Sequence, residues 1–426
     1  MQFRKWLASG SLHIVLIGNL AGQGSLLIVT PALTRIYTPD DFGIYQLGFF
    51  VGALVLPLST LRVEQIIPRL GSEGEVVFWL RRAYTLLLSI VALIVILSAV
   101  MPHSKWPGFT EVALIAAGLL LASAVTVLDN ATLLFRQDYR RLGARNFLSG
   151  FLGAAAQILA GIWWPSPVSL GLALAFGRLL SIGLTIDWSH FRTAKPTNSA
   201  GAYPLSQRFF AIATGTLSTS SLQLPATMFV AGAGLNIGGQ VTMAQRLAGT
   251  PSSLVAQGLA QIVSGICGKN VRESRPGLYD FLKRFVFKLI LLGTVVVGGL
   301  VAVLFNAHEL LLGPGWETMA QAAGILAPLF LLQLVVSPIT VVLALLGEQK
   351  VFFGFECVRT IFVAGSVIIA FALTSNHVAV LLVWTVSGGI SYMFLLGLVL
   401  NRARRFDSSV RAMPGRLQNG GGVYPS

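Results

Sequence analysis

Stretches of apolar residues long enough to cross a lipid bilayer recur along the whole chain. A membrane helix needs about 20 mostly apolar residues, because lipid offers no hydrogen-bond partner to an unpaired backbone group. Charged residues make up only 11% of the 426 residues, against roughly a quarter in a soluble domain. The composition therefore excludes a water-soluble fold of this size, and we expect an all-α integral membrane protein. Twelve stretches qualify as transmembrane helices: 11–34, 42–60, 83–101, 112–135, 147–164, 168–186, 209–232, 237–267, 286–305, 322–346, 351–373 and 378–400.

Lysine and arginine are distributed in the pattern that sets membrane orientation. Cytoplasmic loops of membrane proteins carry the excess of both residues. With the N-terminus inside, the outer loops hold only Arg35 and Lys105, while Arg178, Arg246 and Arg359 lie within spans. All other basic residues fall in cytoplasmic segments, so the formal charge of +14 needs no nucleic acid as a partner. The pattern predicts a multi-pass protein with both termini in the cytoplasm.

A polar stretch after the sixth span, containing Pro196 and Pro204, indicates a linker. Six helices return the chain to its starting side, so two such halves share one orientation and suit a pseudo-two-fold axis along the membrane normal. We expect two six-helix lobes around a central cavity. The predicted parts are an N-terminal lobe (1–190), a linker (191–207), a C-terminal lobe (208–400) and a basic cytoplasmic tail (401–426).

Prolines recur at matching places in the two halves. Pro31 and Pro57 lie in the first two spans of one half, and Pro225 and Pro251 lie in the first two spans of the other, with the same spacing. Proline removes a backbone hydrogen bond and kinks a helix. Matched interruptions favour a transport cavity between the halves. The alternative is that membrane helices simply carry more proline than soluble ones.

Polar residues also share faces on the opening helix of each half. Asn19 and Gln23 are one turn apart on the first span, and Thr216, Ser220 and Gln223 have helical spacing on the seventh. These faces suit a hydrated central cavity. Interhelical hydrogen bonds would produce the same pattern, so both interpretations stay open.

Enzymatic chemistry has few candidates in this chain. A membrane glycosyltransferase would need carboxylates at a membrane face. Asp40 and Asp41 are the only adjacent acids, but they follow Thr38 and Pro39, which together form a typical helix start. The predicted outer loops are also too short for a catalytic domain.

Motifs for metals, disulfides and nucleotides are not expected either. Cys267 and Cys357 stand in no CxxC or CxxH setting. The sequence contains no Gly-rich phosphate loop of the Walker type, which argues against ATP-driven export by this chain alone. We expect no cofactor beyond a possible H⁺ or Na⁺ gradient.

Ionisable residues inside the spans are the remaining candidates for function, because a charge at membrane depth is costly. Glu356 and Arg359 are three residues apart, which favours a mutual ion pair. Asp129 is predicted to be either a proton-titrating site for ion coupling or a partner for an arginine. Arg246 has no acidic neighbour in sequence and therefore suits an anion, since guanidinium binds phosphate well.

Several segments resemble Wzx-type oligosaccharide flippases, in the polysaccharide-export branch of the multidrug/oligosaccharidyl-lipid/polysaccharide flippase superfamily. The matching segments run in the same order along nearly all of the chain. They are Pro31-Ala-Leu-Thr-Arg35-Ile-Tyr-Thr-Pro39-Asp-Asp-Phe-Gly43-Ile-Tyr45, Thr60-Leu-Arg62-Val-Glu64, Phe135-Arg-Gln-Asp-Tyr-Arg140, Ala244-Gln-Arg246-Leu-Ala-Gly-Thr-Pro251, Gly313-Pro-Gly-Trp316 and Leu346-Gly-Glu-Gln-Lys350.

This resemblance implies alternating access around a cationic cavity in the bacterial cytoplasmic (inner) membrane. The implied substrate is a polyprenyl-pyrophosphate-linked oligosaccharide, flipped outward for O-antigen, capsule or exopolysaccharide synthesis. The implied partners are membrane lipid, a polysaccharide polymerase and a chain-length regulator. The predicted substrate-binding residues are Arg246, Arg35, Arg62, Arg178, Asn19, Gln23 and Gln223.

Two other functions compete with the flippase. One is a drug or cation antiporter of the same superfamily, and the other is a membrane glycosyltransferase or polymerase of lipid-linked sugars. A cation exporter should carry acidic residues in its cavity, whereas the charges inside these spans are mainly arginines. The balance favours an anionic substrate.

Overall fold

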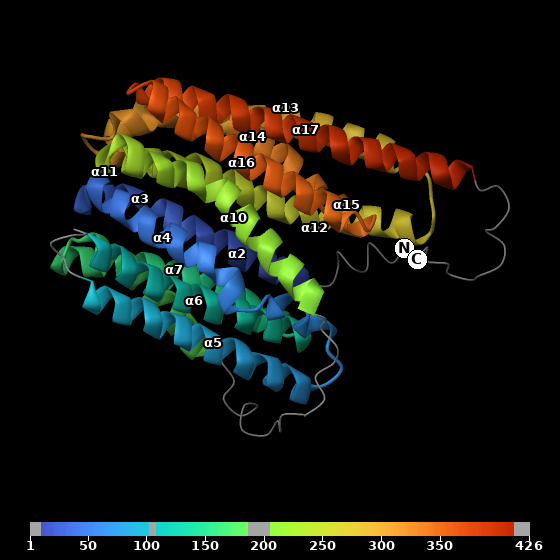
Figure 1. The fold of residues 1–426 in the computed structure, drawn as a ribbon, viewed down its shortest axis with the longest axis horizontal. Coiled ribbons are helices and arrows are strands. Elements are labelled where there is room, and N and C mark those ends of the chain that lie inside the picture. The colour runs from blue at the N-terminus through green and yellow to red at the C-terminus, as the bar shows by residue number, and fades with distance from the viewer. Residues whose placement is uncertain (1–9, 102–107, 186–204, 413–426) are drawn as a thin grey trace.

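The computed structural model describes residues 10–101, 108–185 and 205–412. Within these ranges every regular element is a helix (Figure 1). The first part of the chain contains α2 (Gly10–Ile28), α3 (Thr30–Ile36), α4 (Pro39–Ser59), η1 (Val63–Gln65), η2 (Ile67–Arg69), α5 (Glu73–Val100), α6 (Phe109–Phe135), α7 (Tyr139–Trp163) and α8 (Pro167–Thr185). The second part contains α10 (Leu205–Ala233), α11 (Leu235–Ala244), η3 (Gln245–Gly249), α12 (Thr250–Arg272), α13 (Leu278–Leu312), α14 (Glu317–Val336), η4 (Ser337–Ile339), α15 (Val341–Leu345), α16 (Gln349–Leu373) and α17 (His377–Arg411).

Nine segments of the described chain are long and apolar enough to cross a membrane. They coincide with nine of the predicted spans, namely the second to the sixth and the ninth to the twelfth. The other three predicted positions are helical as well, in α2 with α3, in α10, and in α11 to α12. The chain is therefore a multi-pass, all-helical membrane protein in its described part, and the number of twelve spans stays a prediction.

The helices pack in two groups that run along the long axis of the molecule (Figure 1). Helices α2 and α4 to α8 pack mainly against one another, and helices α10 to α17 do the same. Helix α4 belongs to both arrangements, because it packs against α6 and α8 and also against α10 and α11. We call the contact of α4 with α10 and α11 the seam. Most of the predicted linker (191–207) lies outside the described residues, so the domain boundaries stay predictions.

One turn recurs in the two groups, before α7 and before α16. The backbone N–H of Asp138 donates to the carbonyl of Leu133 at 3.0 Å, and that of Glu348 donates to Leu343 at 2.8 Å. The preceding residue has a positive φ in both turns. Each turn leads into a helix of 25 residues, α7 or α16. The same backbone geometry thus starts the fifth predicted helix of each half.

Three predicted spans are not continuous α-helices. The first breaks between α2 and α3, where Pro31 opens the new helix. The eighth contains the π-helix η3 before Pro251, and the tenth contains η4 at Pro338. Each break lies at a proline, which has no N–H to donate to the preceding turn. Pro225, in contrast, lies within α10 and does not interrupt it. The matched prolines therefore predicted one break in each half, at Pro31 and at Pro251.

Candidate functional site

The start of α4 is fixed by a capping box, which explains the adjacent acids of the sequence. The Thr38 hydroxyl accepts from the Asp41 N–H at 3.3 Å, and the Asp41 carboxylate accepts from the Thr38 N–H at 2.8 Å. This pattern satisfies two backbone donors that a helix start leaves open. The prediction that Asp40 and Asp41 belong to a helix start is confirmed.

Two glycines let α4 and α11 approach each other closely just beyond this start. A Cβ added to Gly43 would meet the backbone of Leu235 at 2.5 Å, and one added to Gly239 would overlap the carbonyl of Pro39. Backbone therefore packs on backbone at this end of the seam. The close approach brings α4 beside the segment that carries Arg246.

Arg178 and Arg246 come together next to α4, and we call them the arginine pair. Arg178 lies about 16 Å from the start of α8 at 1.5 Å per residue, and Arg246 lies in η3. The two guanidinium groups are close enough to interact electrostatically, and Tyr45 of α4 is close to both. Arg178 donates to the Ser123 hydroxyl at 3.2 Å, and the Arg246 guanidinium lies 6.0 Å from the centre of the Phe42 ring.

No carboxylate of the described chain forms an ion pair with either member of the arginine pair. Both side chains are half-buried. Two positive charges within electrostatic range repel one another, and an anion between them relieves this repulsion. The geometry therefore favours an anionic ligand at this place.

Helix η3 gives Arg246 its position. The N–H of Thr250 donates to the carbonyl of Gln245, five residues back, because Pro251 interrupts the ordinary pattern. Short π-helical turns inside α-helices frequently occur at functional sites. Neither the π-turn nor the approach of Tyr45 has a sequence signal beyond Pro251 itself.

A neutral polar contact crosses the seam between α4 and α10. The Gln46 amide donates to the Gln223 carbonyl oxygen at 3.4 Å and to the Thr227 hydroxyl at 3.5 Å. Gln223 was predicted from its spacing with Thr216 and Ser220, while Gln46 was not predicted. The polar face of α10 therefore makes at least one interhelical hydrogen bond, as the alternative to a hydrated cavity anticipated.

The other predicted binding residues lie apart from the arginine pair. Arg35 is exposed at the end of α3 and donates to the carbonyls of Pro31 at 3.0 Å and Leu310 at 2.8 Å. Arg62 lies at the opposite end of α4, where it pairs with Glu64 at 3.2 Å. The half-buried side chains of Asn19 and Gln23 lie on α2, which packs against α7.

Asp129 forms a buried ion pair with Arg145, which links α6 to α7. Tyr84 of α5 interacts electrostatically with both groups. The prediction that Arg145 lies in a cytoplasmic loop is wrong, because α7 begins at Tyr139 and the Arg145 side chain is fully buried. The first two turns of α7 are rich in polar residues, so the sequence suggested a loop there and did not indicate that these turns are buried.

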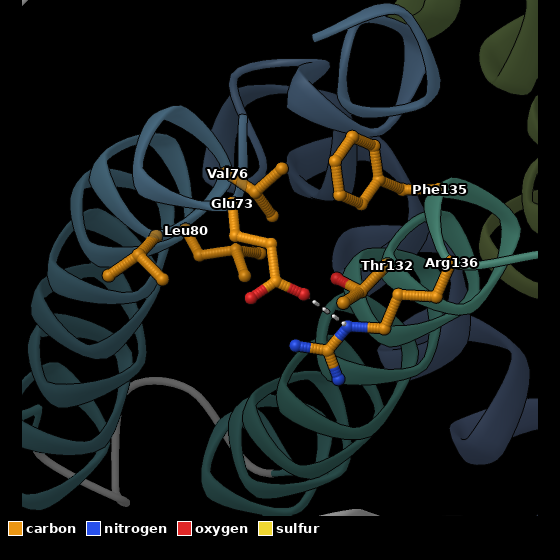
Figure 2. Close-up of a pocket in the computed structure, with 7 residues that line it drawn as sticks. Glu73, Val76, Leu80, Thr132, Phe135 and Arg136 are labelled. Atoms are coloured by element: carbon orange, nitrogen blue, oxygen red, sulfur yellow. Dashed lines mark ion pairs between the residues drawn. The ribbon is translucent and has the colours of Figure 1, made fainter. Parts of the chain in front are cut away.

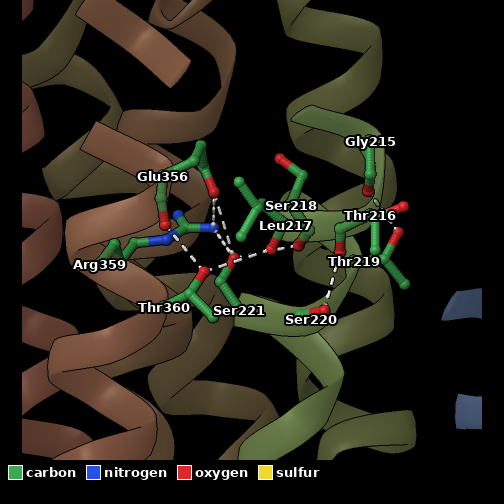
Figure 3. Close-up of polar contacts among 10 residues, drawn as sticks. All are labelled: Gly215, Thr216, Leu217, Ser218, Thr219, Ser220, Ser221, Glu356, Arg359 and Thr360. Atoms are coloured by element: carbon green, nitrogen blue, oxygen red, sulfur yellow. Dashed lines mark hydrogen bonds and ion pairs between the residues drawn. The ribbon is translucent and has the colours of Figure 1, made fainter. Parts of the chain in front are cut away.

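Glu356 and Arg359 form the predicted pair at 2.8 Å, and both are buried. Figure 3 shows that Ser221 joins this pair from α10, accepting from Arg359 and donating to Glu356. Thr360 of α16 adds a hydrogen bond of 3.4 Å to the carbonyl of Leu217. Ser221 and the Leu217 carbonyl of α10 thus bind α16 on one side of the helix, while Gln223 contacts Gln46 of α4.

Two pockets of the described chain lie away from the arginine pair. One is a cavity of about 10 Å³ beside the Glu73–Arg136 ion pair of 3.4 Å (Figure 2), which holds at most about one water molecule. The other is an open hollow of about 410 Å³ between the ends of α10 and α16, lined by Phe371 and His377 among others. Among the described residues, no three His, Cys, Asp or Glu side chains lie close enough together to hold a metal ion.

No protein-family model matches this chain, and neither does any curated protein. Solved structures match over nearly its whole length. The lipid II flippase MurJ in an inward closed conformation has a TM-score of 0.66 at 11% identity, covering 94% of this chain and 90% of that one. An inward-facing multidrug resistance MATE family transporter of the MOP superfamily has a TM-score of 0.61 at 13% identity, covering 94% and 96%.

A MOP superfamily transporter from Pyrococcus furiosus matches as well. Its TM-score is 0.53 at 16% identity, covering 94% of each chain, and it is described by a reversed polarity of its binding pocket that suggests a different function. At such identities these likenesses concern the fold alone. The chain has the fold that MATE transporters share with the MurJ flippase.

Proposed function

We propose that this protein is a flippase that moves a polyprenyl-pyrophosphate-linked oligosaccharide from the cytoplasmic to the outer leaflet by alternating access. The proposal joins the sequence resemblance to the position of the arginine pair. Sugar hydroxyls and a pyrophosphate cannot cross hydrocarbon unaided, because each buried polar group without a partner costs on the order of a few kcal/mol. A polyprenyl tail needs no such help.

The observation that carries the proposal is the arginine pair without a carboxylate. A diphosphate that leaves the leaflet surface loses hydration, and fixed positive charge replaces that loss. Arginine offers two parallel hydrogen bonds to a phosphate, where lysine offers a point charge. We assign the pyrophosphate to Arg178 and Arg246, with Ser123 and Tyr45 as neutral neighbours.

The buried carboxylates argue against the cation antiporter. Each buried acid of the described chain is already compensated: Asp129 by Arg145, Glu356 by Arg359, and Asp407 by backbone N–H groups at 2.9 to 3.0 Å. A cation exporter needs a carboxylate that is free to meet its substrate. The glycosyltransferase is disfavoured because Asp40 and Asp41 serve the start of α4.

The remaining parts of the proposal follow from the basic residues and the resemblance. The protein lies in the bacterial cytoplasmic membrane with both termini inside, and an H⁺ or Na⁺ gradient drives flipping. The flipped oligosaccharide passes to a polysaccharide polymerase and its chain-length regulator. Arg35 and Arg62 act at the two ends of the path rather than beside the arginine pair. Asn19, Gln23 and Gln223 contact the sugar.

Flipping of a labelled lipid-linked oligosaccharide in proteoliposomes tests the proposal directly. Arg246→Lys should retain partial activity, Arg246→Ala should lose at least about tenfold for one charge-assisted hydrogen bond, and Arg246→Glu should be inactive. Lys350→Glu, an exposed residue with the same change of charge, is the matched control. Rates are normalised to membrane-inserted protein, and near-normal flipping by a well-inserted Arg246→Glu variant contradicts the assignment.

A further inference from the structure

The outward face of α13 changes from apolar to cationic along its length. Phe287, Leu291 and Val295 are 71%, 67% and 69% exposed and recur at helical spacing, as expected of side chains that face lipid. Arg284 lies one turn before Phe287 and Lys288 one turn before Leu291 on the same face, and both are exposed. The stripe therefore meets the end of the hydrocarbon with two positive charges.

Helix α17 repeats this arrangement next to α13. Val386, Ile390 and Phe394 are exposed on one face of α17. Arg404 and Arg405 extend that face at helical spacing, and both are exposed. The two helices pack against each other, and the α17 stripe also borders α16, where Phe394 stacks on Phe355.

Asp407 sets the two helix ends in register. Its carboxylate accepts from the N–H groups of Gly277 and Leu278 at 3.0 Å and of Tyr279 at 2.9 Å. An acid at a helix N-terminus satisfies open donors and favours the helix dipole. The carboxylate therefore pins the end of α17 to the start of α13.

This anchor places the four cations on its membrane side. From the contact between Asp407 and α13, Arg404 is about 5 Å away and Lys288 about 15 Å away at 1.5 Å per residue. Arg402 is held separately by Glu348 at 2.8 Å. The cations thus form a band over a limited depth. We call Arg284, Lys288, Arg404 and Arg405 the basic band.

The basic band has no ion-pair partner within the described part of the chain. Asp280 is an exposed acid one turn before Arg284, but it forms no ion pair with it. Lysine and arginine at such a depth extend toward the headgroup layer while their aliphatic stems stay in lipid. Four cations above lipid-facing apolar stripes therefore match a negatively charged headgroup with acyl chains below it.

We propose that the basic band binds an anionic phospholipid on the exposed surface of α13 and α17. Clusters of basic residues at the end of a membrane helix attract anionic lipid, and arginine pairs well with phosphate. The acyl chains lie along the exposed stripes, while the headgroup phosphate meets the four cations. This site is separate from the arginine pair and does not depend on the proposed function.

Lipid selectivity of the full chain in vesicles provides the test. The protein is reconstituted in phosphatidylcholine vesicles, and the motion-restricted fraction of spin-labelled phosphatidylglycerol is compared with that of spin-labelled phosphatidylcholine. The wild type should prefer phosphatidylglycerol at least about fivefold, since one cation near the surface already contributes about that factor. The variant with all four residues changed to Gln should lose that preference.

Two further variants keep the test falsifiable. Changing Arg81, Arg140, Lys269 and Lys350 to Gln removes four other exposed cations and should leave the preference in place. Changing the three arginines of the basic band to Lys keeps the charge and should keep most of the preference. Equal lipid preference in the Gln variant and the wild type, or an equal loss in the control variant, overturns the proposal.

Discussion

The two ends of the seam are built from different parts of the chain. At the predicted outer end, Gly43 and Gly239 bring backbone against backbone. At the predicted cytoplasmic end, the side chain of Arg62 reaches across from η1, where its Nε donates to the Ala211 carbonyl at 3.3 Å and its guanidinium covers Gly215. Backbone packing offers no second arrangement, whereas a long side chain has several rotamers.

Two further features mark the cytoplasmic end as the changeable one. Leu61 and Arg62 both have a positive φ, of 51° and 52°, which is uncommon for residues other than glycine. Arg208 of α10 lies 4.6 Å from the centre of the Trp79 ring of α5, so a second arginine spans the two groups. Opening toward the cytoplasm therefore breaks the side-chain contacts of Arg62 and Arg208, while opening toward the outside separates packed backbones.

The largest expected effect concerns which end faces outward. Cysteines introduced at Ser166 and Asn376, in the predicted outer loops, should react with an impermeant thiol reagent added outside intact cells. A cysteine at Ser199, which lies outside the described residues, should react only after the membrane is opened. Labelling of Ser199 from outside would reverse the assignment of the two ends.

The next largest effect concerns the buried ion pair of Asp129 and Arg145, which lies away from the seam. Asp129→Asn leaves Arg145 buried without a counter-charge, which costs about 3 to 5 kcal/mol. Thermal unfolding in detergent should show this loss, and Asp129→Asn combined with Arg145→Met should recover most of it.

Flipping by that double variant decides the role of Asp129. If Asp129 takes part in ion coupling, the double variant should bind substrate, but its flipping should not respond to the ion gradient. If the stable double variant responds to the gradient as the wild type does, the pair is structural. Asp129 would then serve only to hold α6 against α7.

Filling the glycine contact tests the outer end of the seam. Gly239→Leu should destabilise the protein by about 1 to 3 kcal/mol or more, because overpacking forces a shift that packed backbone resists. Gly298→Leu is the control, since a Cβ at Gly298 meets nothing within 4 Å. Equal unfolding temperatures for both variants would show that α4 and α11 separate easily.

The smallest expected effect belongs to the cytoplasmic end. Arg62→Ala removes the hydrogen bond of this side chain to α10, worth about 1 kcal/mol net, so the end of the seam should open about fivefold more often. A cysteine at Thr216, which shares the α4-facing side of α10 with Gln223, with Cys267 and Cys357 changed to Ser, reports this opening through its rate of thiol modification. Arg402→Ala, which removes an ion pair away from the seam, should leave that rate unchanged.

The charged residues show where prediction from sequence ended. Glu356 and Arg359 were paired correctly, because one turn of a helix brings them together whatever surrounds it. Arg145 was placed wrongly, because its partner Asp129 lies on another helix. Arg246 and Arg178 were both predicted to bind substrate, but their positions in the sequence did not indicate that they approach each other. Contacts within one helix follow from spacing, and contacts between helices do not.

The sequence by itself determined that this is a multi-pass helical membrane protein, because lipid demands long apolar helices and the distribution of Lys and Arg predicts their direction. Tertiary structure alone decided which polar groups meet across helices. It brought Arg178 of α8 beside Arg246 of η3, and it pinned Asp407 to the start of α13. The reason is physical: hydropathy can be summed along the chain, whereas the role of a charged residue inside the membrane depends on which residues the fold places next to it.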